Sequence, residues 1–487
     1  MAHYPQTAMF TGFLHLNRFE GDLVDLEVEG EIPDDIDGFF HRVQPDQQFP
    51  PMFDNDQFFN GDGMISQFRI RDGKVNFKQR WARTDKWQLE RAAGKPLFGA
   101  YRNPLTDDPS VKGRIRSTAN TTPIVHAGKL FALKEDSPPL IMDVLSMDTE
   151  GFSNFNGAMK NQTFSAHPKI CPDTGNMCNF GYAATGLLTT DCSYMEVSPT
   201  GELLFESFFT VPYYCMMHDF ALTEHYALFH LVPITSNWDR LKANKPHFGF
   251  DTSMPVYLGV LPRDPKGGAI RWFKAPKTVF ASHVLNAYEE GSRIHFLIPE
   301  AEGNCFPFFP DINDAPFDRA KATPVMTRWV VDMASTGENF ESVTRVSDHV
   351  GEFPRVDDRA VGKKNRHGWM LSMNMEMPWE GAGSRAAGFI MNTLVHFDFQ
   401  TNLQHVFWCG PQSIMQEPCF IARRGSTEEG DGYIVALQDN VVTNYSELLF
   451  LDARNIAAGA VARAKLPFRL RSGLHGTWIN AEHVPGA

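Results

Sequence analysis

A short apolar run, Met64-Ile65-Ser66-Gln67-Phe68-Arg69-Ile70, is followed at once by a turn signal, Arg71-Asp72-Gly73. Runs of this length that end at Gly, Asp, Asn or Pro are typical of β-strands. Similar runs recur along the chain, at residues 129–133, 226–232, 256–261, 293–298, 328–332, 389–399, 433–438 and 448–452. Long helical periodicity is rare, and the better short-helix candidates are residues 83–93 and 453–459. Many short strands without alternating helices indicate an all-β architecture.

The organisation of the chain is that of one unit. No linker rich in Pro, Gly or Ser divides its 487 residues, so we predict a single domain over residues 1–487. The length suits a β-propeller, in which one four-stranded blade takes about 40–70 residues with its loops. No WD or kelch period is present, however, so the residues alone do not give a number of blades.

Composition argues against several classes of protein. The formal net charge is -13 and no stripe of Lys and Arg is present, which argues against nucleic-acid binding. Residues 1–17 lack a basic segment followed by an apolar one, and no apolar run approaches the roughly 18 residues that span a bilayer. The seven cysteines are an odd, scattered set without a Cys-x-x-Cys pair, which is typical of a reducing cytoplasm. Cys171 and Cys178 match no standard zinc motif.

Four of the seventeen histidines lie in distinctive surroundings. They are His167 in Phe164-Ser165-Ala166-His167-Pro168-Lys169, His218 in Met216-Met217-His218-Asp219-Phe220, His283 in Ala281-Ser282-His283-Val284-Leu285-Asn286, and His475 in Gly473-Leu474-His475-Gly476-Thr477-Trp478. Nothing local brings these segments together, because they are separated by 51, 65 and 192 residues. Imidazole suits Fe, Zn, Cu and Ni, but the residues alone do not select four ligands from seventeen histidines.

The four segments resemble the histidine motifs of the carotenoid cleavage oxygenase family, in which four histidines hold Fe(II) at the axis of a seven-bladed propeller. The resemblance runs nearly end to end. Further matching stretches are Phe59-Asn60-Gly61-Asp62-Gly63-Met64, Ala119-Asn120-Thr121, Ala132-Leu133-Lys134-Glu135, Gly351-Glu352-Phe353-Pro354-Arg355, Gln416-Glu417-Pro418 and Ser446-Glu447-Leu448-Leu449-Phe450-Leu451-Asp452-Ala453. The resemblance implies an all-β, seven-bladed propeller whose short helices and loops cap an axial metal site. It also implies one Fe(II) per chain, held by His167, His218, His283 and His475, with O2 as co-substrate.

The resemblance also assigns residues around the metal. Glu135, Glu352 and Glu417 match carboxylates that accept hydrogen bonds from three of the ligand histidines and so orient their rings. Thr121 matches a residue whose side chain crowds one open coordination position, next to where dioxygen would bind. Four histidine ligands leave room for dioxygen on an octahedral iron, which is what the chemistry of the family needs.

The superfamily cleaves carotenoids, apocarotenoids or stilbenes, so the fold does not choose the alkene. Residues 41–46 and Ser66 depart from the pattern of carotenoid cleavers and resemble the bacterial lignostilbene and resveratrol dioxygenase branch. In that branch, residues matching Phe59, Tyr101 and Lys134 grip a 4-hydroxyphenyl ring. Phe59 would stack on the ring, and Tyr101 and Lys134 would hydrogen-bond the phenolic oxygen.

The resemblance therefore implies an oxidoreductase that cleaves the central double bond of a 4-hydroxystilbene into two aromatic aldehydes. An ammonium near a phenol favours the phenolate, whose electrons delocalise toward the double bond and make it a better nucleophile. Lys134 and Tyr101 are thus the residues to which the resemblance gives a catalytic role. The expected partner is a small aromatic alkene, and since relatives in this branch form dimers, a homodimer is a further expectation.

Other functions stay open. An apocarotenoid or carotenoid oxygenase would share the iron site and differ in the tunnel, and cleavage of β-apo-carotenals but not hydroxystilbenes would favour it. A propeller that only binds partners would leave four histidine motifs and three glutamates unexplained. A zinc hydrolase is disfavoured, because catalytic zinc normally takes three protein ligands, often including a carboxylate.

Overall fold

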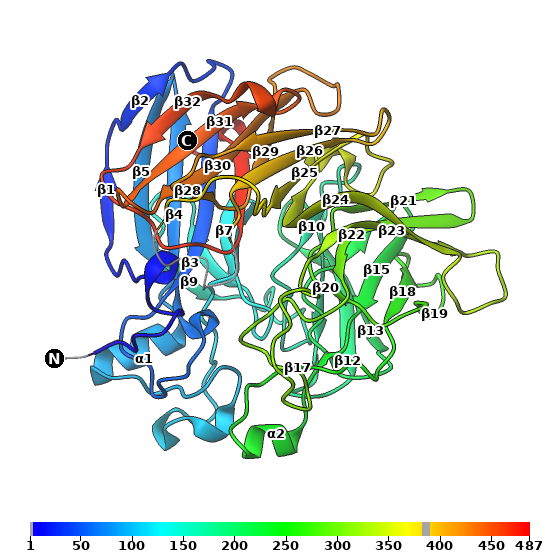
Figure 1. Cartoon of the computed structure of the whole chain (residues 1–487). Helices are drawn as coiled ribbons and strands as arrows, with labels where there is room; N and C mark the ends of the chain where they lie inside the picture. The colour runs from blue at the N-terminus through cyan, green and yellow to red at the C-terminus, as the bar shows by residue number, and fades with distance from the viewer. Residues whose placement is uncertain (1–2, 382–389) are drawn as a thin grey trace. The chain divides into compact units, whose positions relative to one another are not determined.

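The computed structural model describes residues 3–381 and 390–487, and strands make up most of its regular structure (Figure 1). The chain divides into two compact units. Unit 1 comprises Met1–Ser153, Leu371–Phe397 and Leu403–Ala487, and unit 2 comprises Asn154–Met370 and Asp398–Asn402. The expected all-β architecture is confirmed. The single domain predicted over residues 1–487 stays a prediction.

Unit 1 is built mainly from three antiparallel sheets. Their strand orders are β1-β5-β4-β3-β33, β6-β7-β8-β9 and β2-β32-β31-β30-β28, and β29 also pairs with β30. The strands are β1 Gly21–Leu23, β2 Glu27–Gly30, β3 Gly38–Asp46, β4 Asp62–Arg71, β5 Lys74–Trp81, β6 Thr122–His126, β7 Lys129–Leu133, β8 Leu140–Asp143, β9 Thr149–Phe152, β26 Thr393–Asp398, β27 Leu403–Trp408, β28 Ser413–Met415, β29 Cys419–Ala422, β30 Gly432–Asn440, β31 Tyr445–Asp452, β32 Ala460–Lys465 and β33 Gly476–Asn480.

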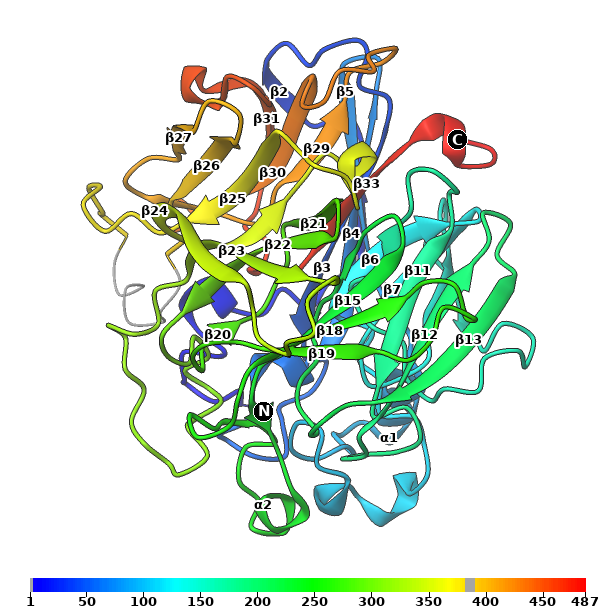
Figure 2. The same cartoon turned by 90° about the vertical axis from the view of Figure 1, so that its right-hand side faces the viewer.

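Unit 2 contains the sheets β10-β11-β12-β13, β14-β15-β18-β19 and β16-β17, and the strands β20, β22, β23 and β24 side by side, with β21 also paired to β22. Figure 2 shows β11, β12 and β13 as neighbours. The strands are β10 Lys169–Ile170, β11 Met177–Tyr182, β12 Asp191–Val197, β13 Leu203–Thr210, β14 Ala221–Leu222, β15 Tyr226–Leu231, β16 Ile234–Thr235, β17 Gly249–Phe250, β18 Tyr257–Pro262, β19 Arg271–Lys274, β20 Phe280–Ala281, β21 Asn286–Glu290, β22 Arg293–Ala301, β23 Val325–Asp332, β24 Ser342–Arg355 and β25 His367–Ser372.

Helices are short. Helix α1 (Asp85–Ala93) begins after Thr84, whose side chain accepts a hydrogen bond from the Trp87 N–H, and it ends at Gly94 in the left-handed conformation. No helix of the described residues has both the length and the apolar character needed to cross a bilayer. The remaining helices are α2 Trp238–Lys242 and the 3₁₀ turns Gly12–Leu14, Phe58–Asn60, Pro104–Thr106, Pro109–Val111, Asp358–Ala360, Ile456–Ala458 and Ala481–His483.

The elements predicted from the sequence are mostly confirmed. Each strand-like run coincides with a strand or lies largely within one, and the run 389–399 contains β26, although residue 389 lies outside the described residues. Helix 83–93 is confirmed as α1. The prediction of a helix at residues 453–459 is wrong, because only a 3₁₀ turn forms there. This segment is the short link between the antiparallel neighbours β31 and β32, which leaves no length for a helix.

The β4–β5 hairpin shows how a local pattern anchors a functional segment. Asp72 and Gly73 both have positive φ (49° and 71°), as an Asp-Gly hairpin turn requires. Phe68 of β4 and Phe77 of β5 pack in one buried cluster. Because β4 begins directly after the segment that carries Phe59, this hairpin fixes where that segment ends.

Candidate functional site

Three of the four predicted metal ligands lie together in unit 2. His167 precedes β10, His218 precedes β14 and His283 follows β20, so each is in a loop at the end of a strand. The Nε2 atom of His218 is 3.0 Å from that of His167 and 3.1 Å from that of His283. The three rings are inclined to one another by 62–71°. Their nitrogen edges therefore meet, and their faces do not stack.

This spacing fits a bound metal ion. Two nitrogens that bind one ion at right angles, each about 2.1 Å from it, are about 3.0 Å apart, whereas a tetrahedral arrangement separates them by about 3.4 Å. The distances of 3.0 and 3.1 Å match ligands at right angles. Among the residues that the structure describes, the side chains His167, His218, His283 and His475 form a group that could hold a metal ion.

Glu352 orients the ring of His283. The Nδ1 atom of His283 is 2.5 Å from Oε2 of Glu352, and its backbone N–H lies 3.4 Å from Oε1. A carboxylate at Nδ1 keeps the proton on that nitrogen and leaves the metal-binding lone pair on Nε2. Phe353 has a φ of 56°, which is unusual for a bulky residue, and its ring stacks on His283 at 5.1 Å. Two consecutive residues of β24, Glu352 and Phe353, thus present a carboxylate and an aromatic face to the same histidine.

Asp219 links two of the histidine loops of unit 2. It directly follows His218, and its Oδ2 atom accepts a hydrogen bond from the backbone N–H of Val284, next to His283. Its Oδ1 atom is 2.8 Å from Nζ of Lys169. Burial alone would raise the pKa of Asp219, but the Lys169 ammonium and the hydrogen bond from Val284 lower the pKa below its ordinary value. The carboxylate therefore stays ionised and holds the two loops together.

The fourth predicted ligand, His475, is positioned within unit 1. Its Nδ1 atom is 2.9 Å from Oε1 of Glu417, whose Oε2 accepts a hydrogen bond from the Gly476 N–H. The backbone N–H of His475 donates to the carbonyl oxygen of Thr121 at 3.3 Å, so the predicted neighbour of the oxygen site lies beside this ligand. Glu417 is thus placed at Nδ1 of a predicted ligand, as Glu352 is in unit 2.

The predicted ring-binding residues also lie together in unit 1. The Nζ atom of Lys134 is 3.3 Å from the hydroxyl oxygen of Tyr101 and 4.8 Å from the centroid of its ring. The ring of Phe59 is centred 6.2 Å from that of Tyr101 and inclined to it by 43°. Lys134 and Tyr101 are buried, at 4% and 5% exposure, whereas Phe59 is half-buried. The group offers an aromatic surface and two hydrogen-bond donors.

A largely buried set of charges surrounds Lys134. Arg102 contacts Glu135 at 3.3 Å and Asp136 at 3.5 Å, and Nζ of Lys134 is 3.9 Å from Asp136. Burial alone would lower the pKa of Lys134, but Asp136 and the other acidic groups nearby raise it above its ordinary value. Burial raises the pKa of Tyr101. At neutral pH the pair is therefore an ammonium and a protonated phenol. The predicted contact of Glu135 with a ligand histidine stays a prediction.

Four side chains that shape these groups were given no role in the sequence prediction. Arg102, Asp136, Asp219 and Phe353 each directly follow a residue that was included in it. Successive side chains of an extended chain point to opposite sides, so a neighbour in sequence is not expected at the same site. At Arg102 and Phe353 a positive φ (53° and 56°) removes that alternation. Adjacency to a motif residue is the one signal that could have found them.

Two of the residues that depart from the pattern of carotenoid cleavers, Arg42 and Ser66, are in contact with each other. Arg42 on β3 lies opposite Ser66 on β4, and its Nη1 atom is 3.5 Å from the serine hydroxyl and 2.7 Å from Gln44. Ser66 also donates a hydrogen bond to Gln79. These residues form a buried polar network inside the first sheet, so they mark the branch through packing and not through chemistry.

Comparison with known proteins identifies the family. The model of the retinal pigment epithelial membrane protein family matches residues 15–480. Lignostilbene-alpha,beta-dioxygenase isozyme III of Sphingomonas paucimobilis is 64% identical over 100% of this chain and 99% of its own. Isoeugenol monooxygenase of Pseudomonas nitroreducens is 41% identical over 96% of this chain and 97% of its own. The crystal structure of Pseudomonas brassicacearum lignostilbene dioxygenase has a TM-score of 0.94 and 40% identity, covering 99% of this chain and 100% of that one.

The structural match confirms the predicted fold class, because the solved structures of this family are seven-bladed β-propellers. The match of the family model to nearly the whole chain and the 64% identity over its full length agree with the histidine motifs. The chain belongs to the carotenoid cleavage oxygenase family, the family of the retinal pigment epithelial membrane protein.

Proposed function

We propose that the protein is an oxidoreductase that cleaves the central double bond of a 4-hydroxystilbene with O2. Each alkene carbon takes one oxygen atom, so one stilbene and one O2 give two aromatic aldehydes and no other product. The 64% identity with a lignostilbene dioxygenase over the full length supports this reaction. The substrate is accordingly a small aromatic alkene.

Fe(II) is the metal that we propose for the four-histidine site, with one ion held per chain. The near right-angle spacing of the imidazole nitrogens supports a coordination number above four, which leaves positions for other ligands. When bound, Fe(II) would supply the one-electron chemistry that lets O2 react with a closed-shell alkene. Glu352 and Glu417 orient two of the rings, Glu135 is proposed to orient a third, and Thr121 limits the space beside His475.

The observation that carries the substrate proposal is the buried ammonium of Lys134, 3.3 Å from the hydroxyl oxygen of Tyr101. A phenol has a pKa of about 10 and is mostly protonated in water at neutral pH. A nearby ammonium favours the phenolate, whose electron density reaches the central double bond through the ring. In this proposal Lys134 stabilises the phenolate, Tyr101 donates a hydrogen bond to the same oxygen, and Phe59 stacks on the ring.

The test is an aerobic assay of purified, Fe(II)-loaded protein with a 4-hydroxystilbene and with its 4-methoxy counterpart, with aldehydes followed by chromatography. We expect cleavage of the hydroxylated compound alone, because the methoxy group has no proton to lose. If neither compound reacts while the protein holds one iron per chain, the stilbene proposal is wrong and a β-apo-carotenal is the next substrate to test.

A second substrate of the same chemical class follows from the comparisons. Isoeugenol monooxygenase is 41% identical to this chain, and isoeugenol is also a 4-hydroxyphenyl alkene. The same phenolate mechanism would activate its side-chain double bond. Parallel assays with isoeugenol and with the 4-hydroxystilbene would show which compound is preferred. A higher kcat/KM for isoeugenol would mean that phenylpropenes are the preferred substrates.

Location and assembly remain predictions. We expect a cytoplasmic protein that forms a homodimer. Size-exclusion chromatography with light scattering tests the assembly, and a mass near the 54.9 kDa of one chain would contradict the dimer.

A further inference from the structure

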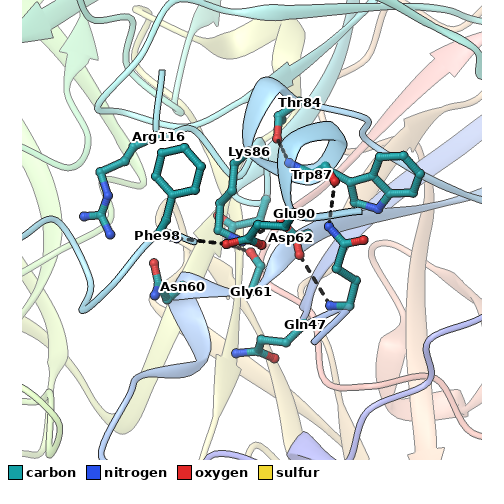
Figure 3. A network of polar contacts seen from close by, with 12 residues as sticks. Gln47, Asn60, Gly61, Asp62, Thr84, Lys86, Trp87, Glu90, Phe98 and Arg116 are labelled. Atoms are coloured by element: carbon teal, nitrogen blue, oxygen red, sulfur yellow. Dashed lines mark hydrogen bonds and ion pairs between the residues drawn. The ribbon is translucent and has the colours of Figure 1, made fainter. Parts of the chain in front are cut away.

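Lys86 is a buried lysine held between two buried carboxylates of unit 1 (Figure 3). Its Nζ atom is 2.8 Å from Oδ1 of Asp62 and 2.9 Å from Oε2 of Glu90. The three side chains are 6% exposed or less. Burial alone would lower the pKa of Lys86, but Asp62 and Glu90 raise it above its ordinary value, so the lysine stays charged.

This ionic cluster, Lys86 with Asp62 and Glu90, calls for an explanation beyond stability. Moving charges out of water is unfavourable, and well-packed apolar side chains often stabilise a protein as well as a buried ion pair does. In some proteins a buried ion pair instead fixes the geometry between the segments that carry the charges. The question is therefore which segments these three residues join.

One carboxylate fixes the segment that carries Phe59. Asp62 begins β4, three residues after Phe59, and the intervening Gly61 packs so closely on β3 that an added Cβ would lie 2.8 Å from the Asp46 nitrogen. Asn120 donates hydrogen bonds to the carbonyl oxygens of Phe59 and Gly61, at 2.8 and 2.7 Å. Asp62 and Asn120 therefore hold the backbone from the carbonyl group of Phe59 to the start of β4.

The other carboxylate fixes the segment that leads to Tyr101. The Oε1 atom of Glu90 accepts hydrogen bonds from the backbone N–H groups of Leu97 and Phe98, at 2.9 and 3.1 Å. Its Oε2 atom is the one that contacts Lys86. Glu90 thus uses one oxygen for the lysine and the other for the chain that reaches Tyr101 three residues later.

A second set of hydrogen bonds joins the segment of Phe59 to the segment of Tyr101 next to the cluster. Asn60, which follows Phe59, donates a hydrogen bond to the carbonyl oxygen of Gly99 at 2.9 Å. Arg116 donates to the same oxygen at 3.2 Å and to the carbonyl of Ala100 at 2.9 Å. The two segments therefore meet at two places, and in both the joining groups are polar and largely out of water.

We propose that Lys86 is a positioning residue for recognition of the 4-hydroxyphenyl ring, acting with Asp62 and Glu90 to set the distance between Phe59 and Tyr101. The proposal rests on the proposed function, in which these two aromatic residues hold the ring. Among the described residues, no hydrogen bond or ion pair of the cluster is with Phe59, Tyr101 or a predicted metal ligand. Its effect is on how well the aromatic surface and the phenol-binding donors match one ring at the same time.

The test compares Lys86→Met with a matched control, Lys95→Met, in the Fe(II)-loaded enzyme. Lys95 lies just after α1, pairs with Asp108 at 3.5 Å and is 61% exposed, so its loss removes a charge without freeing the two segments. For Lys86→Met we expect kcat/KM for a 4-hydroxystilbene to fall by about 10- to 100-fold, mainly through KM. Iron content should not change, and anaerobic binding of the same stilbene, followed by fluorescence, should weaken in parallel.

Glu90→Gln keeps the proposal testable if Lys86→Met does not fold. A glutamine oxygen can still accept from Leu97 and Phe98, while the ionic contact with Lys86 is lost, so a smaller rise in KM is expected. A folded variant with lower Tm but unchanged KM and binding would overturn the proposal, since the cluster would then serve stability alone. If the wild-type enzyme itself does not cleave or bind the stilbene, the proposed function fails first, and the two failures are distinct.

Discussion

In unit 2 three histidines lie in loops, and contacts between residues 65 and 69 positions apart in sequence hold two of these loops. In unit 1 the ring-binding residues Tyr101 and Lys134 lie among charges of their own two segments, because Arg102 directly follows Tyr101, and Glu135 and Asp136 directly follow Lys134. Asp219 and Glu352 are enough to orient two histidine loops. The ring site instead has Arg102 and Asp136 beside it.

The difference follows from what each region has to hold. A neutral imidazole needs one acceptor at Nδ1 to fix its tautomer, so a single carboxylate per ring is sufficient. A buried ammonium that is to stabilise a phenolate has to stay charged before the substrate arrives, which requires compensating acidic groups. The two regions should therefore fail in different ways: damage to unit 2 should lower metal affinity, and damage around Tyr101 should change which ring is accepted.

The largest expected effect comes from Lys134→Met. Without the ammonium, the phenolate loses its main stabilising charge, and kcat/KM for a 4-hydroxystilbene should fall by about 100- to 1000-fold. Lys129→Met is the control, since Lys129 begins β7, the strand that ends just before Lys134, pairs with Glu150 at 2.6 Å and is 46% exposed. Steady-state kinetics with metal analysis checks the result. A loss of iron in Lys134→Met would break the comparison, because the ring site would then also govern the metal.

Glu352→Gln tests the same comparison in unit 2, at a residue that orients a predicted metal ligand. A glutamine can present its amide to Nδ1 of His283 and no longer fixes the tautomer, so iron affinity should fall by about 10- to 100-fold. Unit 2 offers a matched control, Glu289→Gln, because Glu289 makes the same kind of contact with Nδ1 of His225, at 2.9 Å, on the surface. Competition with a chelator measures the affinity. Preference for the hydroxylated over the methoxylated stilbene should remain in the variant once iron is restored.

The fold was predictable from the sequence as far as local patterns determine it. The Asp-Gly turn between β4 and β5 and the capped helix α1 are set by residues within a few positions of one another, and both are confirmed. The helix expected at 453–459 was wrong because its length is limited by the pairing of β31 with β32, which is a tertiary constraint. The propeller itself came from the resemblance, since no sequence repeat marks the blades.

The site was predictable to the extent that its residues lie in recognisable motifs. His283 and Glu352 could be named from their surroundings, although 69 residues separate them. Lys86 could not, because nothing in its local sequence distinguishes a buried lysine from the exposed Lys95. Its role depends on Asp62, which is 24 residues away, and on the loop that Glu90 holds. A buried charge pair of this kind cannot be predicted from the sequence alone, because it forms only when the fold brings its segments together.

The smallest expected effect concerns stability and not ligands. Each unit buries a neutral histidine: burial lowers the pKa of His41 in unit 1 to about 3 and that of His230 in unit 2 to about 4. In the unfolded chain both titrate near 6.5. Their contribution to stability is therefore fully present above that pH and is lost as the pH falls toward the folded values, because protons bind the unfolded chain more strongly. At pH 5.5 each histidine should contribute a loss of about 1.4 kcal/mol relative to pH 7.5.

His41→Gln should remove the part of this loss of stability at acid pH that His41 contributes. The Nε2 atom of His41 is 2.9 Å from the side-chain nitrogen of Gln67, so it accepts a hydrogen bond that a glutamine oxygen can replace. Urea unfolding at pH 7.5 and 5.5 measures the difference. His225→Gln is the control, since Glu289 raises the pKa of that exposed histidine and its loss should not reduce the acid sensitivity. An acid loss in His41→Gln as large as in the wild type would mean that His41 binds a proton without unfolding, and that unit 1 tolerates a further charge in its core.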